Sequence, residues 1–206
     1  MHTFERTPYV TLHGPDGSGK TTVARTVVQA LNREGHGSVF FDDWKQMQGR
    51  ENTFSAAEIK LLSGEGKGLS VLQLAKVAFD SVAISELTDS GIIVVKDRGL
   101  LDVRADLAYR GLDPNDCSGP LVREPDLAVF LSVSEAARHK RLAVKEDIRP
   151  EDFQPNEPGS RLFSMVQHVQ SSVETLEPAN GLLIDTDELG VDQVVERVCN
   201  EVLDRL

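Results

Sequence analysis

The sequence predicts an α/β domain in which a mainly parallel sheet is covered by helices on both faces. Residues 92–95 and 127–131 are continuous apolar runs of the kind found in strands that are buried on both sides. Segments with apolar residues at helical spacing separate such runs, and this alternation is typical of parallel sheets. A chain of 206 residues can enclose one full core, so we expect a single domain over residues 1–206.

The individual elements can be assigned in chain order. Residues 9–13 form a short β-prone run that leads into a glycine-rich loop. Residues 20–34 follow with helical spacing, and Gly35 and Gly37 end that helix. The other expected elements are strands at 38–41, 92–95, 127–131 and 182–185, helices at 55–63 and 69–88, and a closing amphipathic helix at 191–206. The sequence therefore predicts five strands.

The glycine-rich loop after the first strand is a complete phosphate-binding motif of the form G-x-x-x-x-G-K-[ST]. Its glycines let the backbone turn tightly, so that successive N–H groups can point at phosphate oxygens beside a helix N-terminus. The lysine can reach the β- and γ-phosphates, and the threonine hydroxyl suits Mg²⁺. The motif predicts ATP as a ligand. The residues expected to contact ATP are Gly14, Pro15, Asp16, Gly17, Ser18, Gly19, Lys20, Thr21 and Thr22.

Two further polar features belong to the expected site. Asp16 is unusual beside a bound triphosphate, and we expect it to face a substrate hydroxyl or an arginine, although aspartate is also a common turn residue. Asp97 and Arg98 follow a buried strand, and ligands of open α/β sheets bind at the carboxyl ends of strands. Arg98 could clamp a phosphate and Asp97 could hold Mg²⁺, or the two could form a structural ion pair.

The segment at about 140–159 mixes basic and acidic residues and ends in prolines and a glycine. Few apolar residues could anchor it, so we expect it to be mobile. It could be a solvated charged loop or a lid over the site.

Charge and hydropathy exclude several classes of partner. The chain has 22 Lys and Arg against 33 Asp and Glu, a formal net charge of −11. Such a surface repels nucleic-acid backbones and anionic membranes, so we expect no nucleic-acid or membrane partner. The polar residues 1–8 predict no secretory signal, and no apolar run approaches the ~20 residues needed to span a bilayer. A cytoplasmic location is expected.

These segments together resemble the thymidylate kinase family over nearly the whole chain. Residues 14–22 are similar to its phosphate loop, including the carboxylate at Asp16, and Asp97-Arg98 is similar to its Asp-Arg motif. Three segments give supporting likeness: Ala108-Tyr109-Arg110-Gly111, Glu124-Pro125-Asp126-Leu127, and the lid-like stretch from Arg138 to Glu151 that contains Arg149.

The resemblance implies a three-layer α/β/α P-loop kinase fold with a mobile lid, which transfers the γ-phosphate of ATP to an acceptor phosphate. It implies that Lys20, Arg98 and Arg149 neutralise the transferring group, that Asp16 orients the acceptor, and that Mg²⁺ lies near Thr21 and Asp97. It also implies a homodimer. The apolar helix at 69–88 could form the interface, or could equally be buried in the core of the monomer.

The acceptor site departs from the family pattern. Phe41-Asp42-Asp43-Trp44-Lys45 stands where the family has a Thr-Arg-Glu-Pro-like segment. In the helix before Asp97, Lys76 and Leu72 stand where the family has a phosphate-binding arginine and a stacking phenylalanine. Trp44 could replace the lost stacking surface or simply pack. The expected substrate-binding residues are Asp16, Trp44, Leu72, Lys76, Arg98, Tyr109 and Arg110.

The sequence leaves three functions open. The first is an ATP- and Mg²⁺-dependent kinase of dTMP or a related nucleoside monophosphate. The second is a kinase of an unphosphorylated nucleoside or another small metabolite, which the altered acceptor positions would permit. The third is a nucleotide-binding homologue without catalysis.

Overall fold

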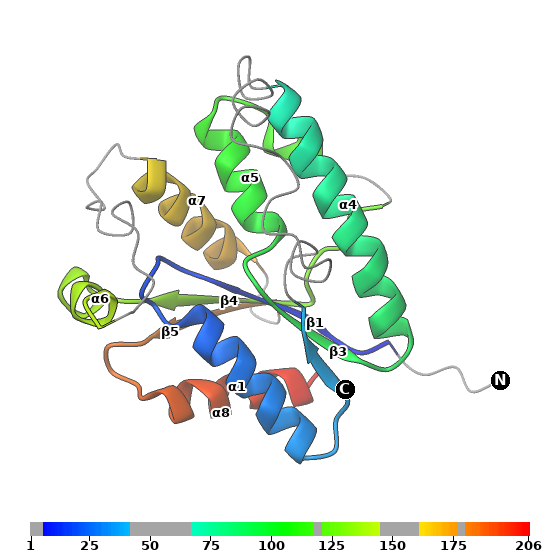
Figure 1. Ribbon diagram of the computed structural model, residues 1–206, viewed down its shortest axis with the longest axis vertical. Coiled ribbons are helices and arrows are strands. Elements are labelled where there is room, and N and C mark those ends of the chain that lie inside the picture. The colour runs from blue at the N-terminus through cyan, green and yellow to red at the C-terminus, as the bar shows by residue number, and fades with distance from the viewer. Residues whose placement is uncertain (1–5, 42–66, 118–120, 145–160, 177–179) are drawn as a thin grey trace.

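The computed structural model describes residues 6–41, 67–117, 121–144, 161–176 and 180–206. Within these ranges a single sheet of five parallel strands has the order β2-β3-β1-β4-β5 (Figure 1). The strands are β1 (Tyr9–His13), β2 (Ser38–Phe40), β3 (Ile93–Asp97), β4 (Leu127–Ser132) and β5 (Gly181–Asp185). The predicted α/β class and all five predicted strands are confirmed.

The register of the sheet places the two polar motifs side by side. β1 lies at the centre, between β3 and β4. Leu12 of β1 is opposite Asp97 of β3, and both strands run in the same direction. The loop that follows β1 and the turn that follows β3 therefore leave the same edge of the sheet as neighbours, which is where open parallel sheets bind ligands.

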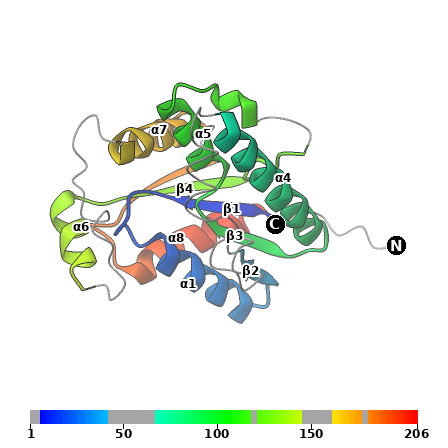
Figure 2. The same ribbon diagram turned by 45° about the horizontal axis from the view of Figure 1, so that its top comes forward.

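Helices cover both faces of the sheet and give the molecule three layers (Figures 1 and 2). On one face lie α1 (Lys20–Arg33) and α8 (Val191–Leu203). On the other lie α4 (Lys67–Asp89), α5 (Leu100–Tyr109) and α7 (Arg161–Thr175). Alternate strand residues explain this division, because Val10 and Leu12 pack in the core with α1 and α8, whereas Tyr9 packs with Ile84 of α4.

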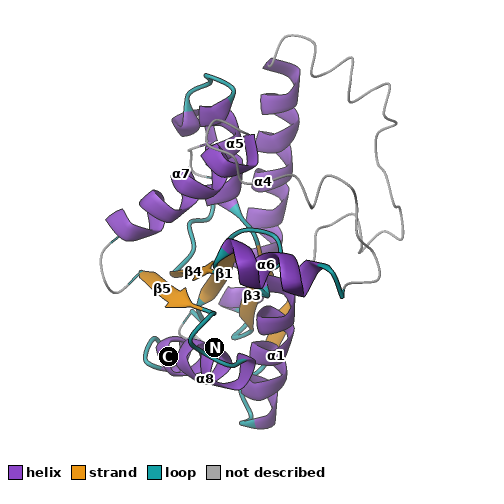
Figure 3. Ribbon diagram, turned by 90° about the vertical axis from the view of Figure 1, so that its left-hand side faces the viewer, coloured by secondary structure: helices purple, strands orange, loops and turns teal. Residues whose placement is uncertain are grey.

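Helix α6 (Glu135–Leu142) lies off the edge of the sheet where β4 ends, as Figures 1 and 3 show. Helices α5, α6 and α7 and the 3₁₀ turn η1 (Pro114–Cys117) were not predicted from the sequence. α6 is short and rich in charged residues, so it shows little apolar periodicity, although Ser134 caps it by accepting a bond from the Ala137 amide at 3.3 Å. The predicted helix at 55–63 lies outside the described residues, as does the predicted lid beyond residue 144.

Helix α4 has both a buried and an exposed apolar face. Val77 and Ile84 are buried, whereas Phe79 is 58% exposed and Val82 is 52% exposed. Burial in the monomer therefore explains part of the apolar character of this helix. Among the described residues, none of the helices is both long and apolar enough to cross a lipid bilayer.

Candidate active site

The glycine-rich loop connects β1 to α1 and has the backbone conformation that its sequence predicts. Gly14 and Gly17 have φ values of 135° and 87°, which residues with a side chain rarely adopt. Both positions are also crowded: a Cβ on Gly14 would clash with the Leu131 carbonyl oxygen, and one on Gly17 would lie 3.0 Å from Cγ of Arg138. The loop is therefore packed against β4 and α6.

Lys20 points back into this loop. Its ammonium group donates to the Pro15 carbonyl oxygen at 2.9 Å and lies 3.5 Å from Oδ1 of Asp16, and the residue is buried. Burial, together with the nearby Arg98 guanidinium, lowers the pKa of Lys20 from its ordinary value. The loop backbone therefore curves around the Lys20 ammonium. Phosphate oxygens bound by the loop amides would lie next to this cation.

Thr21 and Asp97 join the start of α1 to the end of β3. The Thr21 hydroxyl donates to Oδ2 of Asp97. The other carboxylate oxygen of Asp97 is buried and has no hydrogen-bond partner among the described residues. A hydroxyl and a carboxylate with an unsatisfied oxygen are ligands that suit Mg²⁺, which usually keeps several waters and phosphate oxygens as well. The described residues hold no cluster of three or more His, Cys, Asp or Glu side chains that could bind a metal alone.

Arg98 lies between two carboxylates. Its guanidinium donates to Asp16 at 2.6 Å and to Asp102 of α5 at 3.2 Å. Its backbone φ of 65° is unusual for a residue other than glycine. Asp102 also accepts from the Gly99 amide at 3.0 Å and lies 2.7 Å from Nδ1 of the buried His13. The turn after β3 is therefore held by a continuous polar network.

The same network sets the charge of its carboxyl groups. Burial alone would raise the pKa of Asp16, but Lys20 and Arg98 together hold it below its ordinary value. Burial likewise opposes ionisation of Asp102, and His13 and Arg98 outweigh it, so that the pKa of Asp102 is lowered strongly. Asp102 and Asp16 in turn raise the pKa of Arg98 against the effect of burial. All three groups stay charged near neutral pH.

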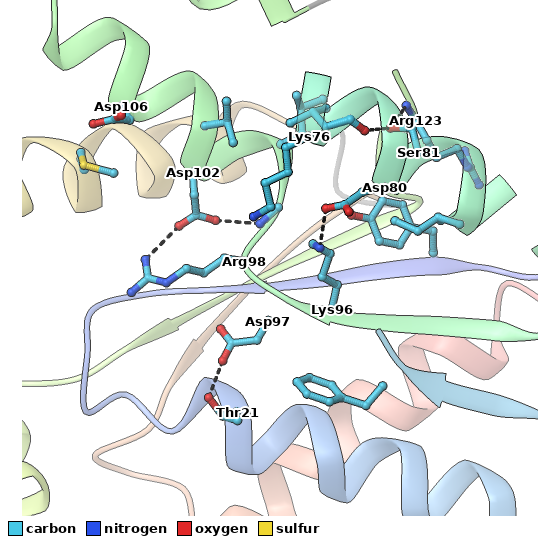
Figure 4. A pocket seen from close by; sticks show the side chains of 18 of the residues that line it. Thr21, Lys76, Asp80, Ser81, Lys96, Asp97, Arg98, Asp102, Asp106 and Arg123 are labelled. Carbon is cyan, nitrogen blue, oxygen red and sulfur yellow. Dashed lines mark hydrogen bonds and ion pairs between the residues drawn. The ribbon is translucent and has the colours of Figure 1, made fainter. Parts of the chain in front are cut away.

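Two cavities meet at this network. The phosphate-loop cavity, of about 660 Å³, is lined by residues 16–23 with Arg141 of α6 and residues 189–191. The α4/α5 cavity, of about 430 Å³, lies between α4, α5 and the end of β3 (Figure 4). Both cavities are lined by Thr21, Asp97 and Arg98. A group bound at these three residues would be in reach of ligands in either cavity.

The structure places the predicted substrate residues unequally. Lys76 of α4 points toward Arg98 and Asp102 in the α4/α5 cavity (Figure 4). Arg110 instead pairs with Asp106 of α5 at 3.0 Å, and Tyr109 is 45% exposed and lines neither of these cavities. Trp44, Arg149 and the side chain of Leu72 lie outside the described residues.

Several residues of the site were missed by the sequence analysis. Asp80 of α4 and Lys96 of β3 form a buried ion pair of 2.8 Å in the wall of the α4/α5 cavity, and the Lys96 ammonium lies 4.8 Å from the centre of the Phe41 ring. One carboxylate oxygen of Asp80 is buried and unpartnered among the described residues. The available signal for this pair was a lysine directly after the β-branched run at 92–95. Arg141, which donates to the Thr186 hydroxyl at 2.8 Å and lines the phosphate-loop cavity, belongs to the charged segment at about 140–159 that the sequence left open as a lid or a solvated loop.

The fold and the site define the class of protein. A parallel sheet with a phosphate loop after its first strand, and a second motif on the neighbouring strand, is the α/β architecture of P-loop kinases. The chain belongs to the thymidylate kinase family, because the family model described as Thymidylate kinase matches residues 12–198. It is therefore a nucleotide kinase.

Individual relatives agree with this class. A thymidylate kinase structure from Candida albicans has the same fold, with a TM-score of 0.65 at 18% identity over 97% of this chain and 92% of that one. A cytidylate kinase of Shouchella clausii (strain KSM-K16) is 24% identical over 94% of this chain and 95% of its own length. A cytidylate kinase of Shewanella denitrificans is 26% identical over 96% of this chain and 97% of its own length.

The network around Asp102 predicts a specific acid sensitivity. Because its pKa is lower in the folded protein than its ordinary value of 3.8, Asp102 stabilises the fold fully above about pH 4 and loses this effect as the pH falls further. Asp102→Asn should therefore lower the free energy of unfolding at neutral pH and flatten its decline between about pH 4 and about pH 2. Urea unfolding across this range measures both effects. Glu196→Gln, at an exposed position on α8, is the matched control and should follow the wild type.

The buried Asp80–Lys96 pair predicts a strong coupling. Asp80→Leu alone leaves the Lys96 ammonium buried without its carboxylate and should cost about 3 to 5 kcal/mol of unfolding free energy. The double variant Asp80→Leu/Lys96→Met removes both charges and should recover most of this loss. Urea unfolding of the wild type, both single variants and the double variant measures the coupling. Additive losses in the double variant would contradict it.

Proposed function

We propose that the chain transfers the γ-phosphate of ATP to a nucleoside monophosphate. The observation that carries this proposal is that two cavities of the described chain share Thr21, Asp97 and Arg98. In the proposed arrangement ATP occupies the phosphate-loop cavity and the acceptor occupies the α4/α5 cavity. The transferred phosphoryl group then lies at the residues that both cavities share.

Phosphoryl transfer requires mainly that the protein position the two substrates and stabilise the charge of the transferring group. A phosphate oxygen of the acceptor forms a bond to the γ-phosphorus, while the bond from that phosphorus to the β,γ-bridging oxygen breaks and its electron pair leaves with ADP. Lys20 and Arg98 neutralise the charge on the transferring group, and the loop amides bind the phosphates that remain. Asp16 orients Arg98 and, through it, the acceptor.

The residues that the two cavities share also suit Mg²⁺. The Thr21 hydroxyl and the Asp97 carboxylate would hold the ion, which neutralises phosphate charge when bound. The unpartnered oxygen of Asp97 supports this assignment. Arg149 of the predicted lid is proposed to neutralise the transferring group. Lid closure would exclude water from the reaction.

A phosphorylated acceptor fits the electrostatics better than an unphosphorylated nucleoside. A nucleoside hydroxyl has to lose its proton during transfer, so a nearby general base is needed. Asp16 is paired with Lys20 and Arg98 and lines the phosphate-loop cavity, so it is not a free base in the α4/α5 cavity. A monophosphate needs no such base. The family model favours dTMP as the acceptor, and the cytidylate kinase relatives favour CMP.

The proposal is tested by the acceptor range of the purified protein. With ATP and Mg²⁺, we expect ADP release with dTMP or CMP well above that with thymidine, cytidine or purine nucleotides. Activity on unphosphorylated nucleosides alone would replace the proposal with a nucleoside kinase. ATP binding without any turnover would identify a non-catalytic nucleotide-binding protein.

Lys20 provides the sharpest test of the phosphate loop. Lys20→Ala should lower kcat/KM by about a hundredfold to a thousandfold, because it removes a charge that the transition state needs. Circular dichroism and urea unfolding check that the variant remains folded. A folded Lys20→Ala variant that retains wild-type turnover would remove Lys20 from the mechanism.

A further inference from the structure

Arg25 is a further cation that lines the α4/α5 cavity. It lies one helical turn after Thr21 on α1, so both side chains project from the same face of the helix, and both line the cavity. The Arg25 guanidinium lies 5.3 Å from the centre of the Phe40 ring at the end of β2. Such stacking restricts a long side chain without using its hydrogen-bond donors.

Arg25 differs from its neighbours in its partners. Arg98 is paired with Asp16 and Asp102, Lys96 with Asp80, and Arg123 with Asp126. Within the described residues, the Arg25 guanidinium lies over the Phe40 ring and forms no side-chain hydrogen bond or ion pair. The residue is also exposed to the cavity. Its donors are therefore available to a ligand.

The position of Arg25 suits an anion next to the shared residues. Thr21 and Asp97 mark the place where the α4/α5 cavity meets the phosphate-loop cavity, and Arg25 lines the same cavity from the α1 side. Lys76 lines it from the α4 side. A planar guanidinium offers two parallel N–H donors, which match the oxygens of a phosphate group.

We propose that Arg25 binds the phosphate group of the acceptor. This inference rests on the proposed function, because it assumes that the α4/α5 cavity is the acceptor site. Arg25 holds the acceptor phosphate on the α1 side, and Arg98 remains for the phosphoryl group in transfer. The stacking on Phe40 keeps the guanidinium in place before the acceptor arrives.

The test compares Arg25→Ala and Arg25→Lys with the wild type. Arg33→Ala is the matched control, because Arg33 is an exposed arginine near the end of the same helix and lines neither cavity. The acceptors are dTMP and CMP with their nucleosides thymidine and cytidine. The readouts are KM and kcat, and the dissociation constant of each acceptor without ATP by calorimetry.

We expect Arg25→Ala to raise the KM and the dissociation constant of the monophosphate about tenfold to a hundredfold, as the loss of a charged hydrogen bond does. The KM of ATP should change by less than about twofold, because the two substrates use different cavities. Arg25→Lys should fall between the wild type and Arg25→Ala, because it keeps the charge and loses the planar fork.

Two results would overturn the assignment of Arg25. One is a monophosphate affinity in Arg25→Ala equal to that of Arg33→Ala. The other is a wild type that binds no monophosphate at all. Failure of the proposed function gives a different result, in which the wild type binds a monophosphate without turnover. The calorimetric comparison then still decides the role of Arg25.

Discussion

The Arg98 side chain lies between Asp16 and Asp102, and this double ion pair joins the loop after β1 to the turn after β3. The parallel register makes the contact available, because it ends these two strands side by side. The left-handed backbone of Arg98 turns the chain there, and the Gly99 amide bond to Asp102 holds the turn. His13, at the end of β1, fixes Asp102 from the other side. Charged groups in a buried site are stable only when they are paired in this way.

The net negative charge of the chain makes locally paired cations necessary at a phosphate site. A protein with a net charge of −11 repels polyphosphates at a distance, so the affinity for them has to come from local geometry. The loop provides it with backbone amides and the buried Lys20, whose position beside Pro15 and Asp16 is fixed before any ligand binds. Preorganised charge of this kind does not have to reorient during transfer. Two acidic side chains, Asp16 and Asp102, therefore help to place the Lys20 and Arg98 cations of the site.

Sequence reasoning predicted the parts of the site that depend on local backbone and on strand order. The phosphate loop was predictable because glycine spacing determines its turns, and the place of Asp97 and Arg98 follows from their position at the end of a buried strand. The Asp80–Lys96 pair joins residues sixteen positions apart on a helix and a strand, and only their packing brings them together. Helix α6 was missed for a related reason. Its Arg138 is fully buried against Gly17, and a charged residue gives no apolar signal for such a contact.

The two cavities differ in how closely the sequence determines them. The phosphate-loop cavity contains one continuous lining segment, residues 16–23, so its ligand can be inferred from a short motif. The α4/α5 cavity is lined by side chains of several elements, among them α1, α4, α5 and β3, so a change at any one of them alters the shape or charge of the proposed acceptor site while the fold stays the same. Specificity for the acceptor can therefore differ among relatives that share the donor site. The Asp80–Lys96 ion pair and the stacked Arg25 are the features through which this chain would determine its own acceptor.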